Sequence, residues 1–187
     1  MEVNPLQPLR DATDTIRVKA DSFGGWEQVF EYFRYENFDE LLTYNDYVII
    51  QIDTDMGEHL NYGVSLTHEG KDRSVEDLVG DVSRLLISKM NQASYEKFQN
   101  QLKFAIAVHS LECWLLPIYA NEKAHSKKTK NCAKQLGRDT KRLGLNCSKE
   151  YRIYDNLSSQ YRNATKLENA KQHQPSLALF LDSLPQP

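Results

Sequence analysis

The sequence predicts an α/β protein in which a mostly parallel sheet is flanked by helices and the carboxyl-terminal part is helical. Two nearly continuous apolar and β-branched runs, 47–52 and 104–108, indicate strands. Runs of this kind are typical of parallel strands buried on both faces. Stretches with apolar residues at three- and four-residue steps lie around these runs, and this spacing indicates helices that cover a sheet.

The elements are expected in a definite order along the chain. Residues 16–20 alternate branched and charged side chains as a short strand does, and a helical stripe follows over 26–42. The run 47–52 is expected to lie centrally in the sheet, and the polar stretch 56–74 predicts a long loop. Pro175 and Ser176 predict the start of the last helix. The other helices are expected at 75–91, 95–102 and 111–119.

Length and composition limit the organisation of the chain. Its 187 residues predict one domain, with an α/β core over 1–120 and a helical extension of the same domain over 121–187. The net charge of −3 argues against a surface that is basic throughout. The apolar runs are far shorter than the roughly 20 residues that span a bilayer, and no signal-peptide core is apparent, so a cytoplasmic location is expected.

The three cysteines suggest neither a disulfide scaffold nor a zinc site. Cys113, Cys132 and Cys147 are odd in number and widely spaced, without a C-x-x-C pair. We therefore expect buried or half-buried thiols at these positions.

The strongest chemical signal is the pair Asp53 and Asp55 directly after the 47–52 strand. Ligands in open α/β sheets bind at the carboxyl ends of the strands. Two carboxylates at such an end are able to converge on Mg²⁺, which takes few protein carboxylates and keeps waters or substrate phosphates as its other ligands. A solvated turn is the simpler explanation of the same residues, because Asp is a common turn former.

Glu112 is the third candidate ligand. It follows the 104–108 strand and lies in an otherwise apolar segment, where a carboxylate is costly unless it is paired or binds a metal. An exposed first-turn Glu favoured by the helix dipole is the alternative. If the two strands are parallel neighbours, Glu112 lies beside Asp53 and Asp55, and three acids around Mg²⁺ or Mn²⁺ suit phosphodiester hydrolysis.

Three segments together resemble a known family. They are 48–55, which ends in the D-x-D pair, 106–116, which contains an E-x-W-L-L pattern, and 175–181, which begins with Pro-Ser. In this order they resemble the Toprim-like proteins allied to OLD-family and RloB-type defence nucleases. The resemblance implies a Toprim-like fold and an Mg²⁺-dependent nuclease that acts on nucleic acid, with DNA as the expected substrate, often beside an ATPase partner.

One residue of the family pattern is missing. Toprim sites also use a glutamate, usually followed by glycine, on a strand upstream of the D-x-D strand, and no such strand precedes Ile16. Glu2 lies in a proline-rich arm and Glu69 follows the D-x-D pair, so neither is a substitute. Either the chain is shortened at its amino end or the site has lost an acid. A noncatalytic Toprim-like module that binds a partner ATPase or nucleic acid is therefore the main alternative.

The segment 121–142 is strongly basic, and a run of lysines is the expected nucleic-acid contact. A solvated helix face explains the same charges. Asp53 and Asp55 also suit a haloacid-dehalogenase-like phosphatase or a nucleotide-sugar transferase. The phosphatase pattern has Thr or Val where Gly57 stands, and the transferase needs a larger acceptor domain. The lysines expected to contact nucleic acid are Lys127, Lys128, Lys130 and Lys134.

Overall fold

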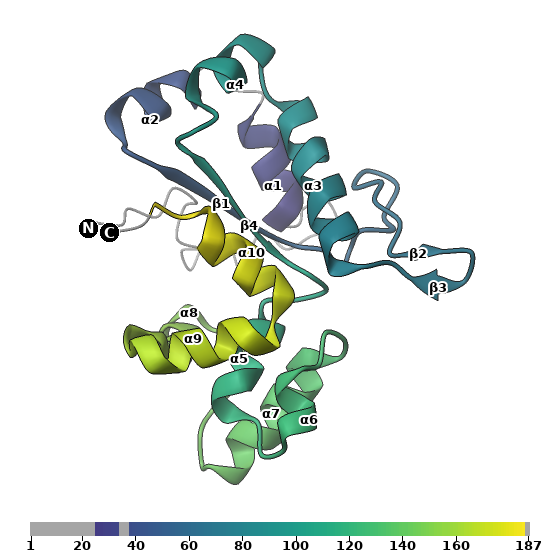
Figure 1. The fold of residues 1–187 in the computed structure, drawn as a ribbon, viewed down its shortest axis with the longest axis vertical. Helices are drawn as coiled ribbons and strands as arrows, with labels where there is room; N and C mark the ends of the chain where they lie inside the picture. The colour runs from purple at the N-terminus through teal and green to yellow at the C-terminus, as the bar shows by residue number, and fades with distance from the viewer. Residues whose placement is uncertain (1–24, 34–37, 186–187) are drawn as a thin grey trace, which may run out of the picture.

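The computed structural model describes residues 25–33 and 38–185 (Figure 1). Within these residues the protein has a mixed α/β fold with a small parallel sheet and a mostly helical carboxyl-terminal part, as the sequence predicts. The elements in chain order are α1 (Gly25–Tyr32), α2 (Phe38–Tyr44), β1 (Val48–Asp53), β2 (Thr67–His68), β3 (Lys71–Asp72), α3 (Val75–Lys89), α4 (Gln92–Phe98), β4 (Leu102–Ala107), α5 (Glu112–Tyr119), α6 (Lys123–Ser126), α7 (Cys132–Arg142), α8 (Tyr151–Ser158), the 3₁₀ turn η1 (Ser159–Arg162), α9 (Ala164–His173) and α10 (Pro175–Ser183).

The two expected strands pair directly. β1 and β4 run parallel, with Ile50 opposite Phe104 and Asp53 opposite Ala107. The expectation that β1 is buried on both faces is wrong for the described residues, because its residues alternate between buried and exposed and Ile49 is 45% exposed. In the same part of the chain its only strand partner is β4, so a central position in a larger sheet is not observed.

One face of the sheet carries the main core. Helices α1 and α3 cover this face (Figure 1), where Ile50, Ile52 and Ile106 pack against Leu78 and Val82 of α3. Ser74 caps α3, since its side chain accepts a hydrogen bond from the Asp77 amide. The apolar residues of α3, at three- and four-residue steps, therefore form the face that packs on the sheet, as expected.

The last helix returns to the other face of β4. Helix α10 begins with Pro175 in its first turn and packs against β4, on which Ala105 and Ala107 provide a flat surface. Leu177 is buried there. The carboxyl-terminal segment thus completes the core of the α/β part rather than forming a separate body (Figure 1).

Helices α5, α7 and α8 pack together below the sheet in the view of Figure 1. A disulfide joins Cys113 of α5 to Cys132 of α7, 19 residues apart in sequence. The prediction that the cysteines are unpaired thiols is wrong for this pair and holds for Cys147, which is free and half-buried. The pairing arises because α5 and α7 pack side by side, a contact that the sequence spacing does not reveal.

Two further expectations have definite outcomes, and a third lies outside the described residues. The helical stretch 26–42 forms two helices, α1 and α2, rather than one. The expected loop 56–74 contains the short antiparallel pair β2 and β3. The strand expected at 16–20 lies outside the described residues. None of the helices in the described ranges is both long and apolar enough to cross a membrane.

Candidate functional site at the carboxyl ends of the paired strands

Backbone hydrogen bonds fix the two strand ends to each other. The Thr54 amide donates to the Ala107 carbonyl at 3.1 Å, so the pairing extends one residue beyond β1. The His109 amide then donates to the Thr54 hydroxyl at 2.7 Å. Thr54 is fully buried, and His109 takes a left-handed backbone with φ of 63°, which turns the chain sharply after β4. This turn brings the start of α5 to the end of β1.

Asp53 is half-buried at this junction. One carboxylate oxygen accepts from the Gln51 side-chain amide at 2.8 Å and the other from the Leu111 backbone amide at 3.3 Å. Burial is the main reason that the pKa of Asp53 rises to about 6, and the negative charges of Asp55 and Glu112 raise it further, while the two hydrogen bonds oppose the shift. The three predicted acids are therefore electrostatically coupled.

Asp55 and His109 lie next to the junction of the two strand ends. Asp55 is exposed, and its charge acts on Asp53, His109 and Tyr62. Burial and the nearby Lys130 ammonium lower the pKa of His109, against the opposing effect of Asp72 and Asp55, and this shift favours the neutral imidazole.

Glu112 is 3% exposed at the start of α5. The Tyr154 hydroxyl donates to Oε1 of Glu112 at 2.6 Å, and the Lys149 ammonium lies 3.4 Å from the same oxygen. Burial would raise the pKa of Glu112, but hydrogen bonds from Tyr154 and Ser110, together with Lys149, outweigh it and lower the pKa. The Glu112 carboxylate is therefore ionised, and the Tyr154 hydroxyl and the Lys149 ammonium stabilise its negative charge.

The donor set fits a cation site made of two carboxylates better than one made of three. Within residues 25–33 and 38–185, no group of three or more His, Cys, Asp or Glu side chains is arranged to hold a metal ion. Mg²⁺ commonly uses one or two carboxylates and fills its shell with water and phosphate oxygens. Asp53 and Asp55 provide such a pair at a strand end, whereas Glu112 lies near them and is bound by Tyr154 and Lys149.

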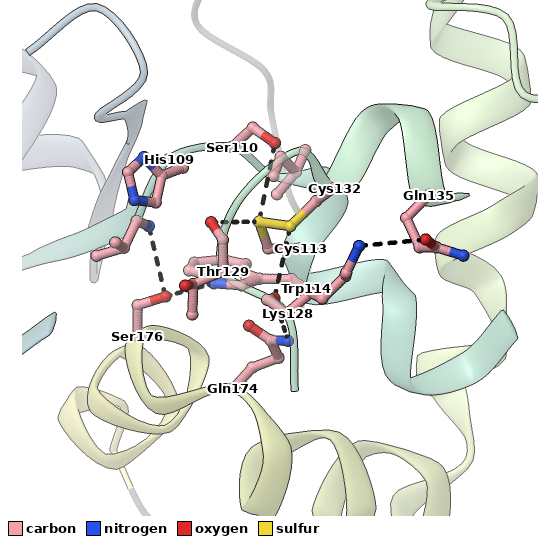
Figure 2. The surroundings of a disulfide bond; sticks show 12 residues. His109, Ser110, Cys113, Trp114, Lys128, Thr129, Cys132, Gln135, Gln174 and Ser176 are labelled. Carbon is pink, nitrogen blue, oxygen red and sulfur yellow. Dashed lines mark hydrogen bonds between the residues drawn. A yellow bond between two sulfur atoms is a disulfide. The ribbon is translucent and has the colours of Figure 1, made fainter. Parts of the chain in front are cut away.

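Two of the segments that carried the family resemblance meet in space. The Trp114 indole N–H donates to the Ser176 hydroxyl at 2.8 Å, and both side chains are buried (Figure 2). The Trp114 ring also stacks on Phe180, with centroids 5.9 Å apart. The Trp of the E-x-W-L-L pattern and the Ser of the Pro-Ser pair therefore hold α5 and α10 together next to Glu112.

The four predicted lysines differ in their surroundings. Lys128 and Lys134 line a common cavity, Lys130 donates to Asp72 of β3, and Lys127 is exposed and does not line the cavity. Two of the four lysines, Lys128 and Lys134, therefore lie at one cavity, and Lys130 is in an ion pair.

Sequence reasoning missed several residues that shape these sites. Gln51 and Tyr62 bind Asp53, the latter through its hydroxyl to the Asp53 carbonyl at 3.0 Å. Tyr154 and Lys149 bind Glu112 from about 40 residues away in sequence. Arg138 joins the lysine cavity. Only Arg138 had a usable signal, because it follows Lys134 by four residues and so shares its helix face.

Comparisons of the chain with protein-family models, curated protein sequences and solved structures give no match.

Proposed function

We propose that this chain is a Toprim-like, Mg²⁺-dependent nuclease domain, or a subunit derived from one, in a bacterial defence system. The observation that carries the proposal is the placement of the half-buried Asp53 carboxylate at the carboxyl ends of two parallel strands, where it accepts a hydrogen bond from the Leu111 amide and lies within the field of Asp55 and Glu112. Functional sites concentrate perturbed acids of this kind. A divalent cation would relieve the repulsion that Asp53 bears.

Asp53 and Asp55 would hold Mg²⁺ or Mn²⁺ in this proposal. When bound, the cation supplies a Lewis acid that polarises a phosphoryl oxygen and lowers the pKa of water. Gln51 and the Leu111 amide orient the Asp53 carboxylate, and Tyr62 fixes its backbone. Tyr154 and Lys149 hold Glu112 ionised at the edge of the acid pair, where its charge strengthens the site for cations.

The partners follow from the same proposal. The segment before α7 and the first turn of α7 provide cations for a nucleic-acid strand, with DNA as the proposed substrate. These cations are Lys127, Lys128, Lys130 and Lys134. The resemblance to defence nucleases further leads us to propose an ATPase partner and a cytoplasmic location.

A noncatalytic Toprim-like module is the second candidate, and the contacts of Glu112 favour it. An acid that already accepts a hydrogen bond from Tyr154 and pairs with Lys149 has less capacity to bind a metal. In this alternative the acid cluster is a remnant, and the basic surface binds a partner or nucleic acid without cleavage.

Calorimetric titration with Mg²⁺ and Mn²⁺ separates the two candidates. We expect binding by the wild-type chain, with at least a tenfold loss of affinity in Asp53→Asn and Asp55→Asn. Asp46→Asn is the matched control, because Asp46 is exposed just before the opposite end of β1. No binding by the wild-type chain, or equal binding by all variants, would favour the noncatalytic module.

Cleavage of plasmid DNA tests the reaction itself. With Mn²⁺ or Mg²⁺ present, we expect nicking by wild type and by Asp46→Asn and none by the Asp53→Ala, Asp55→Ala double variant. Cleavage retained by the double variant contradicts the nuclease proposal, because no metal-binding acid pair would then be needed.

A further inference from the structure

A cavity of about 260 Å³ lies against α7 in the helical part of the molecule. Its walls combine cationic and amide side chains and include no carboxylate. The lining residues are Lys128, Asn131, Lys134, Gln135 and Arg138. The cavity is smaller than the roughly 300–1,000 Å³ of drug-sized ligand sites, so it suits a single chemical group with a small substituent.

The charge around the cavity is strongly positive within an acidic chain. Residues 121–142 contain eight Lys and Arg residues and two acidic residues, while the whole chain has a net charge of −3. A local excess of this size in a concave surface raises the concentration of anions there.

Two of the three cations are free to bind an anion. Lys134 and Arg138 are exposed and make no hydrogen bond or ion pair with any residue in the described part of the chain. Other basic residues differ, since Lys130 pairs with Asp72 and Lys171 with Asp182. Unpaired cations that face one cavity repel each other, and an anion between them removes that repulsion.

The third cation is held in place by a buried network. The Lys128 ammonium lies 3.3 Å from the Gln135 amide oxygen. The Gln135 amide nitrogen donates to Asp139 at 3.2 Å and lies 3.0 Å from Nδ1 of His125. Gln135 and Asp139 are both buried. Because the nitrogen is committed to Asp139, the oxygen must face Lys128, and this side of the cavity is preformed. Figure 2 shows Lys128 and Gln135 on the same side of the disulfide.

The backbone of α7 adds to the same potential. The positions that line the cavity from α7 follow the spacing i, i+3, i+4 and i+7 from Asn131, so they share one face of the helix. Asn131 is the N-cap, and its side chain makes no capping hydrogen bond. The first-turn amides are therefore not satisfied by a capping side chain, and the positive end of the helix dipole favours an anion beside them.

We propose that this cavity binds a phosphate group. Guanidinium and ammonium groups together with the amide group of Asn131 offer donors to phosphate oxygens, and Arg in particular binds such oxygens in pairs. The identification of the ligand as a phosphate of a nucleic-acid strand rests on the proposed function, whereas the phosphate site itself does not. A 5′-terminal phosphate of a strand and a free phosphate or pyrophosphate share this chemistry.

Fluorescence anisotropy with the full 187-residue chain in EDTA tests the proposal. The probes are a labelled oligothymidylate with a 5′-phosphate and the same strand with a 5′-hydroxyl, with pyrophosphate as competitor. We expect the Lys134→Gln, Arg138→Gln variant to bind the 5′-phosphorylated strand at least tenfold more weakly than wild type. The slope of log affinity against log salt should fall by about 1.4, at roughly 0.7 per phosphate contact on single strands. The Lys141→Gln, Arg142→Gln variant removes equal charge from the same helix and should retain the affinity.

Each outcome has a defined meaning. If wild type prefers the 5′-phosphorylated strand and the Lys134→Gln, Arg138→Gln variant loses this preference, the ligand of the cavity is a phosphate of a nucleic-acid strand. If only the binding of pyrophosphate, measured by calorimetry, is weaker in the Lys134→Gln, Arg138→Gln variant than in wild type, the cavity is a phosphate site for a small ligand. The proposal is overturned if wild type and the Lys134→Gln, Arg138→Gln variant bind both labelled strands equally and also bind pyrophosphate equally. An equal loss of affinity in the Lys141→Gln, Arg142→Gln variant overturns it as well. These measurements are made in EDTA and need neither a bound cation nor cleavage, so failure of the nuclease proposal leaves their result unaffected.

Discussion

Asp53 is an acid whose surroundings disfavour its charge. The end of β1 places it in a half-buried position, and the chain returns from β4 so that Glu112 and Asp55 both add negative potential there. Two hydrogen-bond donors reduce the cost without removing it. An acid that is half-buried near other negative charges, at a cost to the stability of the fold, is typical of a binding site.

The stability of the chain should therefore depend on pH through Asp53. Its pKa of about 6 in the folded protein exceeds the ordinary value of 3.8. Between these two pH values the folded state binds more protons than the unfolded state, so stability falls as pH rises and the full penalty is present above pH 6. We expect Asp53→Asn to be more stable than wild type by about 2 kcal/mol at pH 8, with the difference vanishing near pH 4.

Urea unfolding at the two pH values measures this effect. Asp46→Asn serves as control and should match wild type throughout. A stability difference for Asp53→Asn that is the same at both pH values would show that packing, and not ionisation, causes it. Saturating Mg²⁺ should narrow the difference at pH 8, because a ligand bound only by the folded wild type stabilises it.

At the scale of elements, local patterns predicted strands and helices but not which of them meet. The apolar run before Asp53 is enough to predict β1, because few other structures accept consecutive β-branched residues. The same run suggested burial on both faces, and the exposure of Ile49 shows that hydrophobicity alone does not reveal which faces are covered. The hydrogen bond from Tyr154 to Glu112 joins residues 42 positions apart in the sequence, and no local periodicity indicates such a contact.

The disulfide illustrates the same limit. Cys113 and Cys132 pair because α5 and α7 cross at that point, and their sequence spacing matches no known motif. The acid pair of the candidate site was predictable for the opposite reason, since Asp53 and Asp55 lie in one continuous strand end. Glu112 was predictable as a neighbour of that end once β4 was assumed to be parallel to β1.

The Cys113–Cys132 bond should contribute measurably to stability. Closing a loop of this length removes chain entropy from the unfolded state and is worth about 3 kcal/mol. We expect addition of dithiothreitol, or the Cys132→Ser substitution, to lower the free energy of unfolding by that amount. Cys147→Ser should leave the effect of dithiothreitol unchanged. A wild-type chain whose unfolding midpoint is insensitive to dithiothreitol would contradict this expectation.

At the scale of the whole molecule, the carboxyl-terminal segment belongs to the α/β core. Helix α10 covers the second face of β4, where Leu177 is 4% exposed, and Phe180 stacks on Trp114 of α5. The Trp114–Ser176 hydrogen bond fixes the same junction. The sheet and the helical part are therefore joined by a buried interface, and this interface favours cooperative unfolding of the two as one unit.

Removal of the last helix tests this arrangement. A chain that ends at residue 174 should lose the apolar cover of β4 and unfold without a cooperative transition, whereas one that ends at residue 185 should behave like the full chain. The Leu177→Ala variant gives a graded version, with an expected loss of about 2–5 kcal/mol from transfer and cavity terms. Circular dichroism melting and urea unfolding measure both. A truncated chain with an unchanged cooperative transition would mean that residues up to 174 fold without α10, and the interface between α10 and β4 would then be a surface contact rather than core.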